Sequence, residues 1–205
     1  MQIQILVLAA DGYGAGKTTV AEYLMKKGFI ATQFMTPMRA MLRGLLQSLC
    51  WDDDEIEDWL TGSKKNAELP PPFPAGCTMR HLQQTLGTEW GRHQVGDLFW
   101  VDALIHRVGM VTEDIQKLER DGSPERLKLV VDSARRPEEV TRLRAAFGED
   151  AVELLKICGR GQQNGHQIEI PFGGLGEIVV MNDGSVEDLY RQIDTVLDLR
   201  IPHFK

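Results

Sequence analysis

One stretch near the start of the chain decides the fold: Ala10-Asp11-Gly12-Tyr13-Gly14-Ala15-Gly16-Lys17-Thr18-Thr19. It follows a β-rich apolar run, residues 2–9, and opens a segment whose apolar spacing predicts a helix that stops at Gly28. Glycines between a strand and a helix let successive backbone N–H groups point inward at a phosphate. Lys17 would then reach the β- and γ-phosphates, and the Thr18 hydroxyl would bind Mg²⁺. The stretch therefore predicts a P-loop.

The motif departs from the consensus G-x-x-x-x-G-K-[ST] at its first position, where Asp11 replaces glycine. Gly12 and Gly14 lie close by and can supply the flexibility that the turn needs. A carboxylate beside a polyphosphate is unfavourable, so Asp11 is expected to point away or to bind through a cation. The alternative is a glycine-rich turn with a chance lysine, and Gly16-Lys17-Thr18-Thr19 in this strand–helix context argues against it.

The rest of the chain alternates β-rich runs with segments of helical spacing. Further strands are predicted at residues 29–34, 127–132, 152–158 and 177–181. Helices are predicted from Pro37, at 79–92, 100–111 and 137–147, and from an N-cap at Ser185. This alternation predicts a three-layer α/β fold: a five-stranded parallel sheet with helices on both faces. Ligands on such sheets bind beyond the carboxyl ends of the strands.

The 205 residues fit a single domain. Residues 50–78 break the alternation with an acidic patch, 52–58, and a proline-rich run, 69–76, so they are expected to form a surface excursion. A glycine- and glutamine-rich loop, residues 159–176, separates the fourth and fifth predicted strands.

The formal charge of −7 argues against a nucleic-acid polymer as the main partner, because such partners select a basic surface. Three widely spaced cysteines indicate reduced thiols in the cytoplasm. No apolar run reaches the roughly 20 residues that a membrane helix needs. The first residues read as a strand and not as a signal peptide.

The third predicted strand ends at Asp132, where P-loop proteins place a carboxylate that reaches the metal. Arg135 and Arg136 follow, and a guanidinium there can neutralise charge on a transferring phosphoryl group or grip the acceptor. The alternative is a solvated helix start with local ion pairs to Glu138 and Glu139. No glutamate follows Asp132 directly, which disfavours an ATPase, and the chain has no N-K-x-D motif, which disfavours a GTPase.

The predicted helix at residues 79–92 carries two faces. Met79, Leu82, Leu86 and Trp90 form the apolar stripe, whereas Arg80, Gln84, Gly87, Thr88 and Gly91 share another face at helical offsets. That second face, without bulk, would leave room for an acceptor, with Arg80 on its phosphate and Gln84 on the edge of its base. The alternative, equally weighted from composition alone, is close helix packing at the glycines. Trp100 and Asp102 could line the same pocket, although an aromatic side chain here is more often core.

These motifs resemble the phage-type deoxynucleoside monophosphate kinases of the P-loop nucleoside-monophosphate kinase-like fold. The resemblance spans most of the chain and rests on residues 16–21, 80–92, 133–139 and 181–189. It implies transfer of the γ-phosphate of ATP to a dNMP with Mg²⁺, in the host cytoplasm if phage-encoded. It also implies an acceptor-binding excursion at about residues 50–100 and a lid at about 159–176. For the 79–92 helix, the resemblance favours an acceptor pocket over close helix packing.

The resemblance assigns roles by position. It implies catalytic roles for Lys17, Asp132, Arg135 and Arg160, the last at the start of the lid. ATP would be held by Gly12, Gly14, Ala15, Gly16, Lys17, Thr18, Thr19 and Asn182. The acceptor would meet Arg80, Gln84, Thr88, Arg92, Trp100 and Asp102, and the metal would meet Thr18 and Asp132. Ser133 stands where relatives usually carry an aspartate, which leaves the metal-side carboxylate open because adjacent strand positions face opposite sides.

Two other classes of function remain open at this point. A kinase of a hydroxyl acceptor, such as dephospho-coenzyme A or a nucleoside, would need a carboxylate base, and Asp132 could serve. A non-catalytic nucleotide-binding switch is kept open by the departures at Asp11 and Ser133. The base that is accepted, the need for deoxyribose and the formation of a homodimer are not decided by the sequence.

Overall fold

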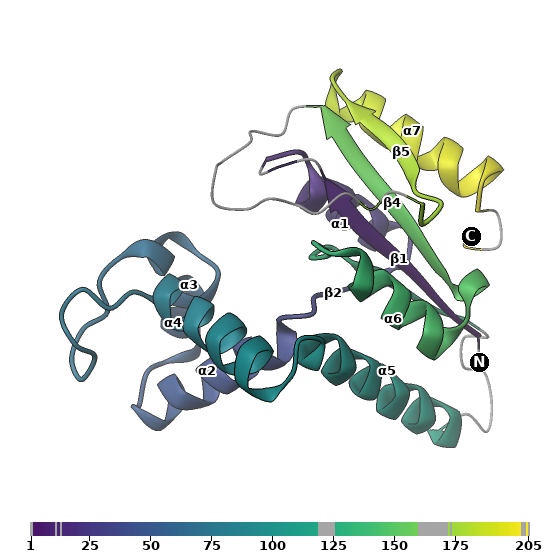
Figure 1. The fold of residues 1–205 in the computed structure, drawn as a ribbon. Coiled ribbons are helices and arrows are strands. Elements are labelled where there is room, and N and C mark those ends of the chain that lie inside the picture. The colour runs from purple at the N-terminus through teal and green to yellow at the C-terminus, as the bar shows by residue number, and fades with distance from the viewer. Residues whose placement is uncertain are drawn as a thin grey trace. The chain divides into compact units, whose positions relative to one another are not determined.

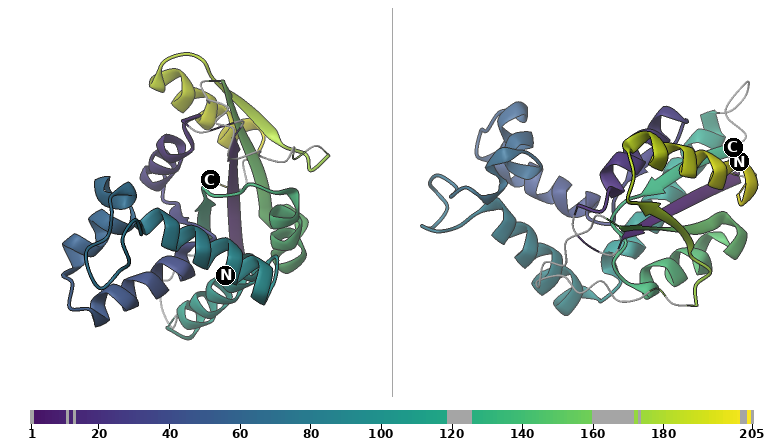
Figure 2. Two further views of the ribbon diagram at one scale, coloured as in Figure 1. Left: turned by 60° about the vertical axis from the view of Figure 1, so that its left-hand side comes forward. Right: turned by 90° about the horizontal axis from the view of Figure 1, so that it is seen from above.

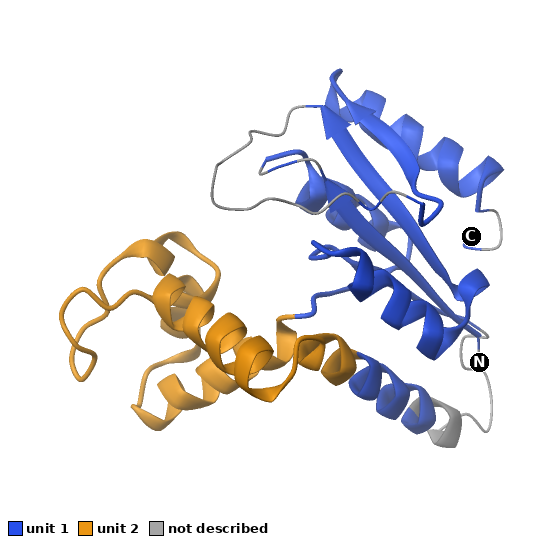
Figure 3. Ribbon diagram, viewed as in Figure 1, with its two compact units in different colours: residues 1–34, 105–205 blue, residues 35–104 orange. Residues whose placement is uncertain are grey.

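The computed structural model describes residues 2–10, 12, 14–118, 126–159, 172, 174–201 and 204, with residues 115–118 as backbone alone. The chain divides into two compact units (Figure 3). Unit 1 comprises residues 1–34 and 105–205, and unit 2 comprises residues 35–104. Unit 2 contains the whole segment, about residues 50–100, that the sequence predicts as an excursion.

Unit 1 is built on a five-stranded sheet with the order β2-β3-β1-β4-β5, in which every neighbouring pair is parallel. The strands are β1 (Gln2–Ala10), β2 (Ile30–Thr32), β3 (Arg126–Val131), β4 (Val152–Gly159) and β5 (Ile178–Asn182). Helices α1 (Lys17–Lys26) and α7 (Val186–Leu199) lie on one face of the sheet and α6 (Pro137–Phe147) on the other (Figures 1 and 2). The predicted three-layer α/β fold is confirmed.

Strand β1 is the centre of the sheet. Its residues from Gln4 to Ala10 are all buried, because β3 and β4 flank it and helices cover both of its faces. Leu6, Leu8 and Ala10 join a core cluster with side chains of α1 and α7. The predicted P-loop thus starts from a strand that is buried from Gln4 to Ala10.

Helices α1 and α7 are also joined at the surface. The Tyr23 hydroxyl donates to Asp194 at 2.8 Å, Lys27 pairs with the same carboxylate at 2.9 Å, and the Tyr23 and Tyr190 rings stack. The Lys27 hydrogen bond holds the pKa of Asp194 below its ordinary value. This contribution to stability is therefore complete above the ordinary aspartate pKa and is lost as the pH falls through the lowered one.

Unit 2 is helical and has its own core. It contains α2 (Thr36–Ser48), α3 (Asp53–Leu60), the short 3₁₀ helix η1 (Ser63–Asn66), α4 (Met79–Gln84), the π-helix η2 (Thr85–Val95) and the start of α5 (Phe99–Leu118), which continues into unit 1. A 3₁₀ turn, η3 (Glu149–Ala151), lies in unit 1. The unit 2 core contains Leu42, Leu46, Ile56, Trp59, Leu60, Leu69, Cys77 and Met79.

Two features of unit 2 are not evident from its local composition. The acidic patch forms helix α3: Asp52 caps it by accepting from the Glu55 N–H at 2.7 Å, and the helix buries Ile56, Trp59 and Leu60. In α2, Leu42 and Leu46 are buried, whereas Met41 and Leu45 are 45% and 43% exposed. In both cases packing against neighbouring helices decides what local composition leaves ambiguous.

Candidate functional site

The predicted P-loop connects the buried end of β1 to the first turn of α1. Gly14 and Gly16 both have left-handed backbone conformations, with φ of 79° and 105°, which suit glycine because it has no Cβ. Gly16 is the N-cap of α1 and supplies no side-chain cap, and the first turn holds no acidic residue. The positive end of the helix dipole is therefore not neutralised by a first-turn carboxylate, as an anion site requires. Asp11 and Tyr13 lie outside the described residues.

Lys17 and Thr18 begin α1, and neither belongs to the buried face of that helix, which consists of Val20, Ala21 and Leu24. Thr18 is exposed and Lys17 is half-buried. Asn182, expected among the ATP-binding residues, contacts the backbone of the loop: its side-chain amide donates to the Ala15 carbonyl at 2.9 Å.

Asp132 and Ser133 follow the end of β3, the neighbour of β1 in the sheet. The Asp132 N–H donates to the Thr32 carbonyl at 3.4 Å, and its Oδ2 accepts from the Gln33 amide at 3.0 Å. Its Oδ1 is buried and has no hydrogen-bond partner among the residues that the structure describes. The Ser133 hydroxyl accepts from the Phe34 N–H at 3.0 Å. Ser133 thus fixes the segment that follows β2, whereas Asp132 has one carboxylate oxygen, Oδ1, without a described donor.

The sequence predicts Thr18 and Asp132 as the residues that meet Mg²⁺. A buried carboxylate oxygen without a donor favours a cation, because desolvation of an unpaired charge is costly. In the described part of the chain, no group of three or more His, Cys, Asp or Glu side chains could hold a metal ion. Mg²⁺ at kinase sites commonly takes one or two carboxylates together with substrate phosphates, and does not require a protein cage.

Arg135 lies in the turn that leads from β3 to α6, and a buried carboxylate shapes this turn. Glu139 is 1% exposed, and its Oε2 accepts from the Arg135 N–H at 2.8 Å and from the Arg136 N–H at 3.2 Å. The sequence suggested a solvated glutamate here and missed this role. The acidic residue three positions after a helix N-cap was the available signal. The Arg135 side chain is exposed.

Replacing Glu139 with alanine is expected to destabilise the protein by about 2–3 kcal/mol, because two backbone donors would lose their acceptor in a buried turn. Glu139→Gln keeps one acceptor oxygen and should cost about 1 kcal/mol. Urea unfolding measures both. Glu138→Ala is the matched control, since Glu138 is the exposed neighbour in the same turn, and its effect should stay within about 0.5 kcal/mol. Equal losses at both positions would contradict the assignment to Glu139.

The predicted acceptor residues lie in unit 2, on α4, η2 and the start of α5. Arg80, Gln84, Thr88 and Asp102 are exposed, and Arg92 is half-buried. The Arg80 Nε donates to the Asn66 side chain at 2.6 Å, which ties the guanidinium to η1. The side chains predicted to contact the acceptor therefore all lie within unit 2.

The expected open face at Gly87 and Gly91 is wrong. From Thr85 to Val95 the helix is a π-helix, so its residues no longer follow the α-helical spacing. Gly87 and Gly91 are buried, whereas Arg80, Gln84 and Thr88 are exposed. The Trp100 indole donates to the Gly87 carbonyl at 2.7 Å and is only 2% exposed. The glycines serve helix packing, and Trp100 supports the helix from inside.

Gly91→Ala is expected to destabilise unit 2 by about 1–3 kcal/mol, because an added Cβ would lie 2.6 Å from carbon atoms of the buried Trp100 ring. Thermal unfolding measures the loss. Gly44→Ala is the matched control: this glycine lies inside α2 with nothing within 4 Å of an added Cβ. There alanine should stabilise by about 0.5–1 kcal/mol through helix propensity. A neutral Gly91 variant would show that the Trp100 contact is not tight.

The predicted lid is described only at its ends. Arg160 and residues 161–171 lie outside the described residues. At the returning end, the Arg144 guanidinium donates to the Leu175 carbonyl at 2.9 Å and to the Val152 carbonyl at 3.2 Å. Arg144 of α6 thereby joins the segment before β5 to the start of β4.

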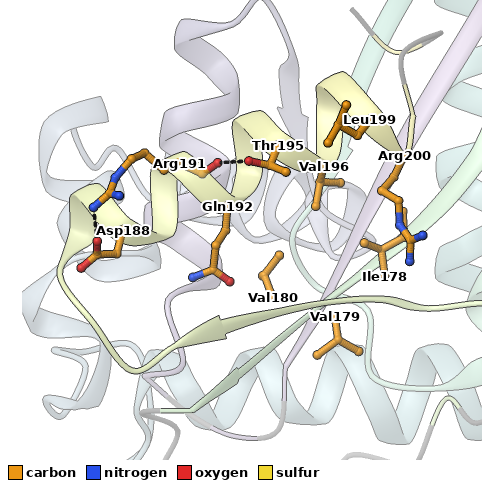
Figure 4. A pocket seen from close by; sticks show the side chains of 10 residues that line it. All are labelled: Ile178, Val179, Val180, Asp188, Arg191, Gln192, Thr195, Val196, Leu199 and Arg200. Carbon is orange, nitrogen blue, oxygen red and sulfur yellow. Dashed lines mark hydrogen bonds and ion pairs between the residues drawn. The ribbon is translucent and has the colours of Figure 1, made fainter.

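A cavity of about 500 Å³ lies between β5 and α7, away from the P-loop residues (Figure 4). It is lined by Ile178, Val179, Val180, Asp188, Arg191, Gln192, Thr195, Val196, Leu199 and Arg200. The Gln192 side chain satisfies both backbone groups of Met181 in β5. It accepts from the Met181 N–H at 2.9 Å and donates to the Met181 carbonyl at 2.8 Å. Asp188 pairs with Arg191. The cavity contains none of the sequence-predicted site residues.

Comparison with known proteins gives one informative relative. No protein-family model matches the chain. A protein named "Putative deoxynucleotide monophosphate kinase", from Acanthamoeba polyphaga mimivirus, is 26% identical over 202 residues, which cover 95% of this chain and 96% of that protein. The similarity extends along nearly the whole sequence and supports a kinase function.

A solved structure is also similar: the unliganded sugar kinase of Janibacter sp. HTCC2649. It is 14% identical, with 96% of this chain and 95% of that chain covered and a TM-score of 0.46. None of the helices in the described part of the chain has the length and apolar character of a membrane span.

Proposed function

We propose that this protein is a deoxynucleoside monophosphate kinase, which transfers the γ-phosphate of ATP to a dNMP and yields dNDP and ADP. One observation carries the proposal: a glycine turn with Lys17 at the start of α1 leaves the central strand, and Asp132 follows the adjacent strand with a buried oxygen that has no partner in the described part of the chain. The kinase name of the viral relative supports the reaction class.

The chemistry suits these residues. The attacking group in such a reaction is a phosphate oxygen that is largely ionised near neutral pH, since its second pKa is about 6. A strong general base is therefore not required, and the protein must mainly align two anions and neutralise the moving charge. Thr18 and Asp132 would hold Mg²⁺, which would supply positive charge to offset that of the donor phosphates.

Each proposed residue has a task in this scheme. The Lys17 ammonium binds the β- and γ-phosphates, and the backbone from Gly12 to Thr19 surrounds the phosphates with N–H donors. Arg135, in the turn that Glu139 holds, would meet the transferring group. Arg160, which lies outside the described residues, is proposed to share this role. Unit 2 supplies the acceptor contacts at Arg80, Gln84, Thr88, Arg92 and Asp102, with Trp100 supporting their helix.

A coupled ADP-release assay with Mg²⁺ tests the proposal. The panel contains dNMPs, NMPs, nucleosides and dephospho-coenzyme A. We expect turnover that depends on a dNMP. Activity confined to hydroxyl acceptors would reject the proposal and would make Asp132 a candidate general base. ATP binding without turnover on any acceptor would indicate a nucleotide-binding switch.

Arg80→Gln is expected to raise KM for the dNMP by about 10–100-fold with little change in KM for ATP, because it removes a charged partner of the acceptor phosphate only. Steady-state kinetics with each substrate varied in turn measure this difference. His81→Gln is the matched control, since His81 is the exposed neighbour on α4. An equal rise in both KM values would place Arg80 outside the acceptor site.

A further inference from the structure

Asn182 is the last residue of β5, and its side chain contacts the backbone of the predicted P-loop. Its side chain is largely buried, with 8% of the residue exposed, and its amide nitrogen lies 2.9 Å from the Ala15 carbonyl oxygen. The two residues are 167 positions apart in sequence. This is a buried polar contact that connects the last strand to the phosphate-binding turn of the first.

The space around Asn182 is closed by two glycines. A Cβ at Gly16 would lie 2.7 Å from the side-chain amide nitrogen of Asn182, and a Cβ at Gly159 would lie 2.7 Å from the backbone carbonyl oxygen of Asn182. Both glycines also have left-handed backbone conformations, with φ of 105° and 121°. Gly159 pairs with Asn182 in the sheet and directly precedes Arg160. Asn182 therefore contacts both the P-loop and the residue at which the proposed lid begins.

The hydrogen bond to Ala15 has a geometric consequence. The peptide unit between Ala15 and Gly16 is planar and trans, so its C=O and N–H point in opposite directions. A carbonyl drawn toward Asn182 turns the Gly16 N–H away from Asn182. Glycine backbones rotate readily, so without this bond the Gly14–Gly16 turn would sample more orientations.

We propose that Asn182 is a positioning residue for the triphosphate: it orients the Ala15–Gly16 peptide so that the P-loop amides face the phosphates, and it does not contact the nucleoside. This inference rests on the proposed function only in that the loop binds a triphosphate. It differs from direct contact with ATP, because it predicts an effect on the phosphates whether or not a base is present.

Isothermal titration of Mg²⁺–ATP and Mg²⁺–tripolyphosphate into wild-type protein and Asn182→Leu tests this assignment. Leucine retains a similar volume and removes the donor. We expect affinity for both ligands to fall by about tenfold, the magnitude of one lost buried hydrogen bond. Asn182→Asp, which places a carboxylate against the Ala15 carbonyl, should bind both ligands more weakly still. Enzyme kinetics should show a higher KM for ATP and an unchanged KM for the acceptor.

Gln192→Leu is the matched control. Gln192 also joins β5 to another element through two side-chain bonds to the backbone of Met181, one residue before Asn182. This variant should lose stability in thermal unfolding but keep wild-type affinity for both ligands. A loss of ATP affinity with unchanged tripolyphosphate affinity in Asn182→Leu would overturn the proposal in favour of nucleoside contact. Unchanged affinity for both ligands would also overturn the proposal, because it would show that Asn182 serves only in packing.

The outcome is separable from that of the proposed function, because neither titration contains an acceptor. Failure of every dNMP as a substrate would count against the proposed reaction alone. A wild-type protein that binds neither ATP nor tripolyphosphate would overturn the role of Asn182 together with the P-loop.

Discussion

Lys17→Met is expected to lower kcat/KM by about 10³-fold, because the variant removes the side-chain cation that the P-loop places on the β- and γ-phosphates. Folding should survive. Lys17 is the first residue of α1 and lies outside the buried face that Val20, Ala21 and Leu24 form. Methionine keeps the length of the side chain and is compatible with a helix. The ADP-release assay and thermal unfolding together measure both parts of the expectation.

Lys26→Met is the matched control for Lys17. Lys26 is an exposed lysine in the last turn of the same helix, so its replacement changes the net charge equally but far from the phosphates. Its activity should remain within about twofold of wild type, and its stability should change by no more than a few tenths of a kcal/mol. Undiminished turnover in Lys17→Met would remove the basis of the proposed function.

Asp132→Asn is expected to lower kcat by about 10²-fold and to raise the Mg²⁺ concentration needed for half-maximal activity. Asparagine is nearly isosteric and still offers an oxygen to Gln33, so the loss should reflect the missing charge and not the fold. A magnesium titration of the ADP-release rate measures both effects. The buried, unpartnered Oδ1 is the reason for assigning this carboxylate to the metal.

Ser133→Ala provides the comparison within the same turn. Its hydroxyl accepts from the Phe34 N–H, so alanine should cost about 1 kcal/mol of stability and leave kcat within about threefold. Together, Ser133→Ala and Asp132→Asn test the departure from the pattern of the kinases that the sequence resembles. In those kinases an aspartate usually stands at the position of Ser133. A larger loss of activity in Ser133→Ala than in Asp132→Asn would reverse the assignment of the two residues.

Local signals predicted much of unit 1. The helix predicted at 137–147 matches α6, because proline at its first position and a glycine after its last residue mark both ends. The N-cap at Ser185 is confirmed by its hydrogen bond from the Asp188 N–H at 3.1 Å. Helix α7 buries Leu189, Ile193, Val196 and Leu197 at helical spacing, whereas Val186 at its start is 41% exposed.

Unit 2 was less predictable, because its elements are short and depend on one another. Helix α3 has eight residues, and its acidic composition concealed the buried set of Ile56, Trp59 and Leu60. The π-helix η2 has no simple sequence pattern, and it forms where Trp100 occupies the space over Gly91 and bonds to Gly87. An α-helical wheel therefore placed the two glycines on the wrong face.

The amino-acid sequence alone determined the alternation of strands and helices, the glycine turn with Lys17 and Thr18, and the carboxylate after the third strand. These features depend on residues that are neighbours in the chain, where periodicity and backbone preference act directly. Only the tertiary structure decided that Asp132, among the described residues, keeps a buried oxygen without a partner while the Ser133 hydroxyl has one. It also decided that Glu139 holds the turn at Arg135 and that Asn182 holds Ala15. Those hydrogen bonds depend on side-chain burial and on contacts such as the one that spans 167 positions, which no local pattern encodes.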